Sequence, residues 1–187
     1  MNMEDVEIMS TSPETLVRLQ DGRLVTFPVA GSRPRGKDEK EDDALVADLM
    51  SDEKELSEHN MLVDLGRNDL GRISQYGSVE VTKYQMIHKY SKIMHICSQV
   101  ESNIRPDMDS LDAIKSVLPA GTLSGAPKIR ACEIIDELEP VPRGIYGGAL
   151  GYVDFGGNMD TCIAIRMAVK KNNKVYVQAG GGIVADS

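Results

Sequence analysis

The sequence has few aromatic side chains: they make up 4% of its 187 residues, and tryptophan is absent. Proteins that bind single-stranded nucleic acid stack bases on aromatic rings, and duplex-binding proteins need a basic surface for the phosphates. Here the formal net charge is −8. The composition therefore argues against nucleic acid as a partner. It also implies that an anionic ligand would need a local group of cations or a divalent metal ion.

Cysteine is scarce too, with three residues far apart at Cys97, Cys132 and Cys162. An odd number of thiols without a C-x-x-C pair favours reduced, buried cysteines over disulfides. No apolar run approaches the ~20 residues of a membrane-spanning helix, and no signal peptide opens the sequence. We therefore expect a soluble, cytoplasmic protein without a membrane partner. Hydrophobic residues still make up 41% of the chain, enough for a sizeable core.

The spacing of apolar residues predicts strands near both ends of the chain and helices mostly between them. The predicted strands cover residues 6–9, 15–19, 23–28, 77–81, 87–100, 146–154, 162–170 and 175–179. The predicted helices cover residues 42–50, 52–70 and 109–117, and a fourth ends near residue 138. Because strands and helices do not alternate in βαβ order, we expect an α+β fold. In it, an antiparallel sheet has its helices on one side, within a single domain of residues 1–187.

Turn and capping residues refine these bounds. Asp21-Gly22 predicts a tight hairpin, and residues 29–36 form a basic loop, marked by glycine, that leaves the sheet. Ser51 and Asp52 are candidate caps for the helix that follows. Turns are expected at residues 156–158 and at Asn172-Asn173.

Residues 118–130, LPAGTLSGAPKIR, form a loop with exposed Thr122, Ser124 and Lys128 that runs into a helix. Ser124 or Gly125 is the expected N-cap, and Pro127 belongs to the first turn. Free backbone N–H groups and the helix dipole at such a junction attract a carboxylate or phosphate, although an ordinary helix start has the same pattern. The apolar positions of the helix recur every three to four residues, at Ile129, Cys132, Ile135 and Leu138.

Two carboxylates, Glu55 and Glu58, lie one turn apart on a predicted helix. Glu58 is in line with Leu62 and Leu65, which should face the core, and a buried carboxylate needs a partner. Two oxygen ligands on one helix are a usual half of a Mg²⁺ site. A solvated acidic face explains the same spacing.

His95 stands alone among apolar neighbours, so it is either a core histidine or a general acid/base. His59 is expected on the helix surface or in a structural role. Arg166 lies in an apolar run, where a buried guanidinium needs either a substrate carboxylate or a salt bridge. Asp69 suggests capping or a buried pair.

Tyr146, which is flanked by glycines, is a core residue or a ligand contact. The run Gly180, Gly181 and Gly182 offers backbone N–H groups to an anion, although three glycines are a weak signal.

Together these segments resemble the chorismate-utilising enzymes, and within that family the large subunits of anthranilate synthase. The matching residues, in family order, are 12–14 (SPE), 28–36 (PVAGSRPRG), 55–70 (ELSEHNMLVDLGRNDL), 94–95 (MH), 118–130, 144–148 (GIYGG), 158–166 (NMDTCIAIR) and 178–187 (QAGGGIVADS). The resemblance implies a lyase that converts chorismate and ammonia to anthranilate and pyruvate in tryptophan biosynthesis. It also implies Mg²⁺ as cofactor and a separate glutamine amidotransferase subunit that supplies the ammonia.

The resemblance also implies a role for each candidate residue. Glu55 and Glu58 correspond to ligands on the Mg²⁺ side, and His95 to the catalytic histidine that assists loss of the C4 hydroxyl. Thr122 lines the ring pocket. The enolpyruvyl carboxylate is held by Tyr146, Arg166 and the backbone of Gly180, Gly181 and Gly182.

Ala30 separates this chain from aminodeoxychorismate synthases, which resemble it but carry a lysine there; that sister activity is the nearest alternative. The resemblance implies that the upstream portion and a final helix with two further metal-side glutamates are missing. We therefore expect weak or no turnover from the 187-residue chain, and a silent ligand-binding fragment is a further alternative. Uncovered hydrophobic faces would favour self-association.

Overall fold

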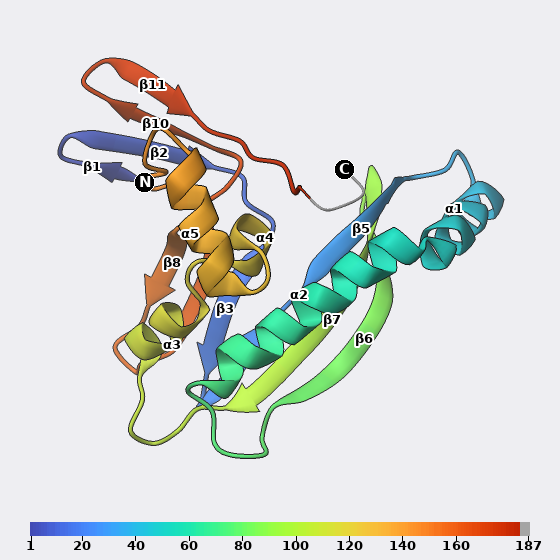
Figure 1. Cartoon of the computed structure of the whole chain (residues 1–187), viewed down its shortest axis with the longest axis horizontal. Coiled ribbons are helices and arrows are strands. Elements are labelled where there is room, and N and C mark those ends of the chain that lie inside the picture. The colour runs from blue at the N-terminus through green and yellow to red at the C-terminus, as the bar shows by residue number, and fades with distance from the viewer. Residues whose placement is uncertain (184–187) are drawn as a thin grey trace.

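In a computed structural model, which describes residues 1–183, the strands form two antiparallel sheets (Figure 1). The smaller sheet has the order β1 (Asn2–Met3), β2 (Val6–Ser10), β10 (Met167–Lys171) and β11 (Lys174–Val177). The larger sheet has the order β5 (Val29–Pro34), β7 (Ile93–Asn103), β4 (Arg23–Thr26), β3 (Thr15–Gln20), β9 (Met159–Ile163) and β8 (Ala149–Val153), with β6 (Glu80–Lys89) beside β7. The predicted α+β class and antiparallel pairing are confirmed. The single predicted sheet is divided into two.

The helices are α1 (Glu39–Ser51), α2 (Glu53–Gly71), α3 (Ser110–Val117), α4 (Gly121–Ser124) and α5 (Lys128–Leu138). Helix α2 lies along β5 and β7, while α3 packs against both α2 and β3 (Figure 1). Their shared core includes Leu24, Val63, Leu70, Val100 and Val117, all buried. Within the described part of the chain, no helix has the length and hydropathy needed to cross a membrane.

The Asp21-Gly22 and Asn172-Asn173 turns and the cap of α2 are confirmed. Asp21 and Gly22 have positive φ angles of 50° and 79°, as a tight turn between β3 and β4 requires. Asn172 and Asn173, with φ of 51° and 57°, join β10 to β11 in the same way. The Asp52 carboxylate caps α2 by accepting hydrogen bonds from the Lys54 and Glu55 backbone N–H groups at 3.1 and 3.2 Å.

The predicted loop at residues 29–36 is wrong, because Val29–Pro34 forms strand β5. This strand pairs with β7 in a register that shifts between Ala30 and Ser32. Gly31, with φ of 81°, is the extra residue of this β-bulge. The glycine, serine and proline of β5 rarely form strands, and here pairing with β7 keeps them extended. Intrinsic strand propensity does not include this tertiary effect.

Two predicted strands are also wrong, because each of them spans a change in chain direction. Residues 87–100 contain the end of β6, a turn at Tyr90–Lys92 and most of β7; the Tyr90 N–H donates to the Ile93 carbonyl at 2.8 Å. Residues 162–170 are divided at Arg166, whose φ is 47°. There the chain leaves β9 in the larger sheet and enters β10 in the smaller one.

The helix after residue 125 differs from the prediction at its start. Gly125, with φ of 126°, separates α4 from α5, and Pro127 rather than Ser124 or Gly125 is the N-cap. No residue of α5 is fully buried. Ile129 and Leu138, the two ends of its apolar repeat, are 70% and 75% exposed. The spacing of these residues predicted the helix correctly. A 3.6-residue period does not show, however, whether another element packs against the apolar face.

We expect Asp42 to stabilise the fold in a pH-dependent way. Its buried carboxylate accepts hydrogen bonds from Arg35 and from the Gly36 N–H at 2.7 Å. The Arg35 guanidinium lowers the pKa of Asp42 from 3.8 to about 2. A carboxyl whose folded-state pKa is lowered contributes stability above its unfolded pKa, and that stability is lost as the pH falls toward the folded value.

Urea denaturation of wild type and Asp42→Asn tests this. The stability difference should be largest near pH 6 and should shrink from about pH 4 downward, toward about pH 2. Asp43→Asn is the matched control, because the neighbouring Asp43 side chain is 73% exposed and should show little difference at any pH. A pH-independent difference for Asp42→Asn would contradict the role assigned to the ionised carboxylate.

Candidate functional site

A cavity of about 750 Å³ brings four of the candidate residues together: Thr122, Tyr146, Arg166 and Gly180. Thr122 comes from α4 and Arg166 from the bend between β9 and β10. The Tyr146 hydroxyl lies 3.4 Å from the position that a Cβ on Gly180 would occupy. A Cβ at position 180 would therefore be in van der Waals contact with the hydroxyl, and a longer side chain would take up part of the cavity. A carboxylate ligand in this cavity would find a guanidinium and a phenol on its walls.

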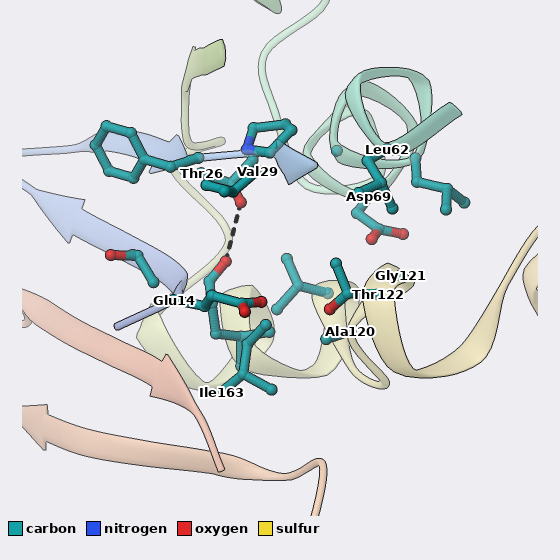
Figure 2. Close-up of a pocket in the computed structure, with 16 residues that line it drawn as sticks. Glu14, Thr26, Val29, Leu62, Asp69, Ala120, Gly121, Thr122 and Ile163 are labelled. Atoms are coloured by element: carbon teal, nitrogen blue, oxygen red, sulfur yellow. Dashed lines mark hydrogen bonds between the residues drawn. The ribbon is translucent and has the colours of Figure 1, made fainter. Parts of the chain in front are cut away.

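A smaller cavity of about 60 Å³ lies beside the first and shares Glu14 and Thr122 with it (Figure 2). It is lined by residues of α2, α4 and the β3–β4 hairpin region. Figure 2 shows Asp69 extending from α2 toward Gly121 and Thr122. The cavity can hold a few water molecules, since each needs about 15 Å³.

Glu14 lines the cavity but was not predicted as a site residue from the sequence. It lines both cavities, and its Oε1 lies 3.6 Å from Nη2 of Arg166. Burial raises the pKa of Glu14, and the positive charges of Arg166 and His95 oppose that rise. A carboxyl with a raised pKa beside a cavity is suited to proton transfer. The match at residues 12–14 pointed to this segment, but a glutamate just before a strand carries no local pattern of its own.

Arg166 is not the buried strand residue that the apolar run suggested. Its side chain is 54% exposed at the bend between the two sheets, and its partner is Glu14. The left-handed backbone at this residue turns the side chain out of the strand path and onto the cavity wall. Its guanidinium therefore remains accessible to a ligand carboxylate.

His95 is half-buried on β7 and is not a core histidine. Its Nδ1 lies 2.8 Å from the Ser32 hydroxyl and 3.3 Å from the Gly31 carbonyl oxygen. The ring also meets the ring of Tyr90 edge-on, with centroids 5.9 Å apart. His95 does not line the large cavity, but it is close enough to Glu14 for its charge to lower the pKa of that carboxyl.

Glu55 and Glu58 lie outside the cavity residues, on the first two turns of α2. Glu55 is half-buried, and its carboxylate is 3.8 Å from Nη1 of Arg33. Glu58 is exposed, so the expectation that it faces the core is wrong; α2 turns His59, Leu62 and Val63 inward instead. Among the described residues, no three His, Cys, Asp or Glu side chains form a group able to hold a metal ion. The two glutamates offer carboxylate oxygens only.

Gly31 lies against two of the predicted site residues. Its carbonyl faces His95, and a Cβ built on it would lie 3.3 Å from Oε2 of Glu55 and 2.9 Å from the Ile96 side chain. Gly31→Ala should therefore add a steric clash to the strain of a positive φ.

Gly77→Ala is the matched control for that variant, because Gly77 has φ of 75° but no atom within 4 Å of a Cβ. We expect Gly31→Ala to lose about 1–3 kcal/mol more stability than Gly77→Ala in urea denaturation. Equal losses would mean that β5 moves away from Glu55 and Ile96 without cost.

Lys128 is not an exposed cation of the loop, as the sequence suggested. Its Nζ is 2.7 Å from Oδ2 of Asp69 and 3.0 Å from the Val117 carbonyl oxygen, and the pair is nearly buried. The predicted buried pair at Asp69 is thus confirmed. Lys128 fixes the start of α5 against α2, which leaves it unavailable to a ligand.

His59 is fully buried, and the surface alternative is therefore wrong. Its Nε2 lies 2.7 Å from the Ser98 hydroxyl on β7. Burial lowers its pKa, and the nearby Ala30 backbone opposes this only in part. His59 holds α2 against the larger sheet.

Gly181 and Gly182 follow Gly180 but are exposed, with no atom within 4 Å of a Cβ built on either. They do not line the cavity that Gly180 lines. The last four residues of the matching segment, 184–187, lie outside the described residues.

Comparison with protein families identifies the family of this chain. The model of the chorismate binding enzyme family matches residues 1–187, the whole chain. The chain belongs to the chorismate-binding enzymes.

Anthranilate synthase component 1 of Pseudomonas aeruginosa is 59% identical over 186 residues, which cover 100% of this chain and 38% of the relative. The same component of Aquifex aeolicus is 54% identical over 187 residues, 100% of this chain and 38% of the relative. This chorismate-binding chain therefore spans less than two-fifths of the length of these curated relatives.

Solved structures agree with this assignment. Anthranilate synthase component I from Streptococcus pneumoniae superimposes with a TM-score of 0.91 at 51% identity, over 99% of this chain and 40% of that one. The menaquinone-specific isochorismate synthase from Escherichia coli gives a TM-score of 0.85 at 26% identity, over 98% of this chain and 42% of that one. The chorismate-binding fold is thus shared by enzymes of different activity, and the higher identity favours the anthranilate synthase group.

Proposed function

We propose that this chain is the chorismate-binding region of an anthranilate synthase large subunit. The parent reaction converts chorismate and ammonia to anthranilate, pyruvate and water, a step of tryptophan biosynthesis. The observation that carries the proposal is the single cavity lined by Thr122, Tyr146, Arg166 and Gly180. Relatives that are 54–59% identical over the whole chain and are named anthranilate synthase component 1 support it.

The cavity residues suit the two carboxylates and the ring of chorismate. Arg166, Tyr146 and the Gly180 backbone would bind the enolpyruvyl carboxylate, with Gly181 and Gly182 adding N–H groups if the segment closes on the ligand. Thr122 would contact the ring beside α4. Binding at two charged ends fixes the ring, so that the attacking ammonia meets C2 in one orientation.

Proton transfer falls to His95 and Glu14. Loss of the C4 hydroxyl as water requires a proton donor, and formation of the aromatic ring requires removal of the C2 proton. Glu14, whose pKa is raised by burial, faces the cavity and interacts with the charge of His95. One group can therefore donate a proton while the other accepts one.

Glu55 and Glu58 would supply two carboxylate oxygens to Mg²⁺, an ion that is usually held by one or two carboxylates together with water and substrate oxygens. When bound, Mg²⁺ would neutralise the ring carboxylate of chorismate. Among the described residues the two glutamates belong to no larger group of His, Cys, Asp or Glu side chains, so water and substrate would have to complete the Mg²⁺ shell, and we expect weak or no turnover from the 187-residue chain.

The ammonia would come from glutamine through a separate amidotransferase subunit, in the cytoplasm. Two alternatives remain within reach of the same experiment: 4-amino-4-deoxychorismate formation, and ligand binding without any reaction. Ala30, on β5, argues against the first because it offers no side-chain amine.

Isothermal titration calorimetry with chorismate, with and without Mg²⁺, tests the proposal, and anthranilate fluorescence and product mass are recorded in the same samples. We expect binding that Mg²⁺ strengthens, with at most a slow appearance of anthranilate when ammonium is present. Aminodeoxychorismate as product would assign the sister activity. Absence of binding under all conditions would overturn the proposal.

Self-association of the chain is a further expectation. Strand β11 is at the edge of the smaller sheet, and its residues Val175, Tyr176 and Val177 are exposed. An apolar edge strand with free backbone groups pairs readily with another chain. Light scattering should show a mass that rises with concentration, and Val177→Lys should reduce that rise. A monomer at every concentration would contradict the expectation.

A further inference from the structure

The β-bulge in β5 places the Ser32 hydroxyl and the Gly31 carbonyl against His95. Ala30 pairs with Ile96 and Ser32 pairs with His95, so Gly31 is the extra residue between two consecutive partners. As a direct cross-strand partner, Ser32 lies on the same face of the sheet as His95. The bulge also turns the Gly31 carbonyl toward the same ring.

Both groups contact the same ring nitrogen. Nδ1 of His95 is 2.8 Å from the Ser32 hydroxyl and 3.3 Å from the Gly31 carbonyl oxygen. The edge-on contact with Tyr90 bounds the ring on another side, at 5.9 Å between centroids. Among the described residues, Nε2 of His95 has no hydrogen-bond partner. The ring is therefore held at one nitrogen and open at the other.

We propose that Ser32 is a positioning residue which, together with the Gly31 carbonyl, fixes the tautomer and orientation of His95. In this arrangement Nδ1 carries the proton and shares it between the two oxygens, while Nε2 keeps a free lone pair. The inference rests on the proposed function in treating His95 as a proton-transfer residue.

The carbonyl decides which tautomer is held. A serine hydroxyl can either donate to a bare Nδ1 or accept from a protonated one, so Ser32 alone permits both tautomers. A carbonyl oxygen accepts only, and it is satisfied only when Nδ1 carries the proton. The Gly31 carbonyl excludes a bare Nδ1, so the Ser32 hydroxyl accepts from the Nδ1 proton, and this shorter contact supplies most of the stabilisation of that tautomer.

The arrangement separates two tasks on one histidine. With Nδ1 occupied internally, Nε2 can accept a proton without a change of tautomer during the reaction. The second nitrogen of a functional histidine is commonly fixed in this way, because its hydrogen bond decides which nitrogen is free.

The test is a ¹⁵N–¹H correlation spectrum of the imidazole nitrogens in the 187-residue chain, recorded in alkaline buffer where imidazoles are neutral. The sequence has only three histidines, so the His95 signals are assigned by their loss in His95→Gln. The variants are Ser32→Ala, which removes the hydroxyl, and Ser32→Thr, which keeps it. Ser57→Ala, an exposed serine on α2, is the matched control.

Wild type, Ser57→Ala and Ser32→Thr should all show His95 protonated at Nδ1 and bare at Nε2. Ser32→Ala should shift His95 toward the Nε2–H tautomer that predominates in free imidazole side chains. Ser32 is exposed, so its truncation leaves the core intact. A wild-type ring protonated at Nε2, or an unchanged tautomer ratio in Ser32→Ala, would overturn the inference.

These outcomes do not depend on turnover. If His95 is protonated at Nδ1 and responds to Ser32→Ala but chorismate does not bind, the proposed function is overturned and the role of Ser32 is kept. If chorismate binds but Ser32→Ala does not change the tautomer, the role of Ser32 is overturned and the proposed function is kept.

Discussion

Lys128→Met is expected to destabilise the fold by about 3 kcal/mol, because it leaves the Asp69 carboxylate nearly buried and without its partner. The two side chains are only 11% and 12% exposed, and their charged atoms are 2.7 Å apart. The lost contact between Lys128 Nζ and the Val117 carbonyl adds to the effect. Urea denaturation at neutral pH measures the change in the free energy of unfolding.

Lys115→Met is the matched control for this variant. Lys115 also pairs with an aspartate, Asp112, but at 3.4 Å and with its own side chain 76% exposed. Such a pair contributes less than about 1 kcal/mol. The double variant Asp69→Asn/Lys128→Met should recover part of the loss, since it removes the unpaired charge as well. Equal effects of Lys128→Met and Lys115→Met would contradict the assignment of a buried pair.

The effect of Lys128→Met should also depend on pH. Burial raises the pKa of Asp69, and Lys128 opposes that rise in the wild type. Without Lys128 the pKa rises further, so the folded variant takes up a proton more readily than the unfolded chain. A raised carboxyl pKa costs stability as the pH rises through it. The destabilisation by Lys128→Met should therefore be smaller near pH 4 than at pH 7.

Segments with short-range signals could be predicted from the sequence. The Asp21-Gly22 turn, the Asp52 cap and helix α2 each depend on contacts between residues close in the chain. Strand β5 could not, because its glycine, serine and proline form a strand only through pairing with β7. The division of an apolar run at Arg166 was equally invisible, since hydropathy is the same on both sides of the bend.

The candidate site shows the same limit. The residue types of Tyr146, Arg166 and Gly180 suggested an anion site, but each had an equally good structural explanation until one cavity joined them. For Arg166 the expected burial was wrong even though its place in the cavity agrees with the resemblance. Glu14 acquires its raised pKa from burial and from charges distant in sequence, which no local pattern contains.

Glu14 and Arg166 should affect ligand and reaction in opposite ways. Arg166→Met is expected to weaken chorismate binding about 10- to 100-fold, because a charge-assisted hydrogen bond contributes about 1.5–3 kcal/mol. Glu14→Gln should leave binding unchanged or tighter, since it removes the carboxylate that lies 3.6 Å from Arg166 and repels the ligand. Calorimetry with chorismate in the presence of Mg²⁺ measures both changes.

The rate of anthranilate formation separates the two residues further. An amide can neither accept nor donate a proton as the Glu14 carboxyl group can, so Glu14→Gln should slow any residual turnover by about 100-fold or more. Lys170→Met is the matched control: it removes a cation from the same strand as the Arg166 bend, but one that pairs with Glu7 on the surface. It should change neither binding nor rate. If Glu14→Gln weakened binding as much as Arg166→Met, the carboxyl would be a ligand contact, and proton transfer would fall to His95 alone.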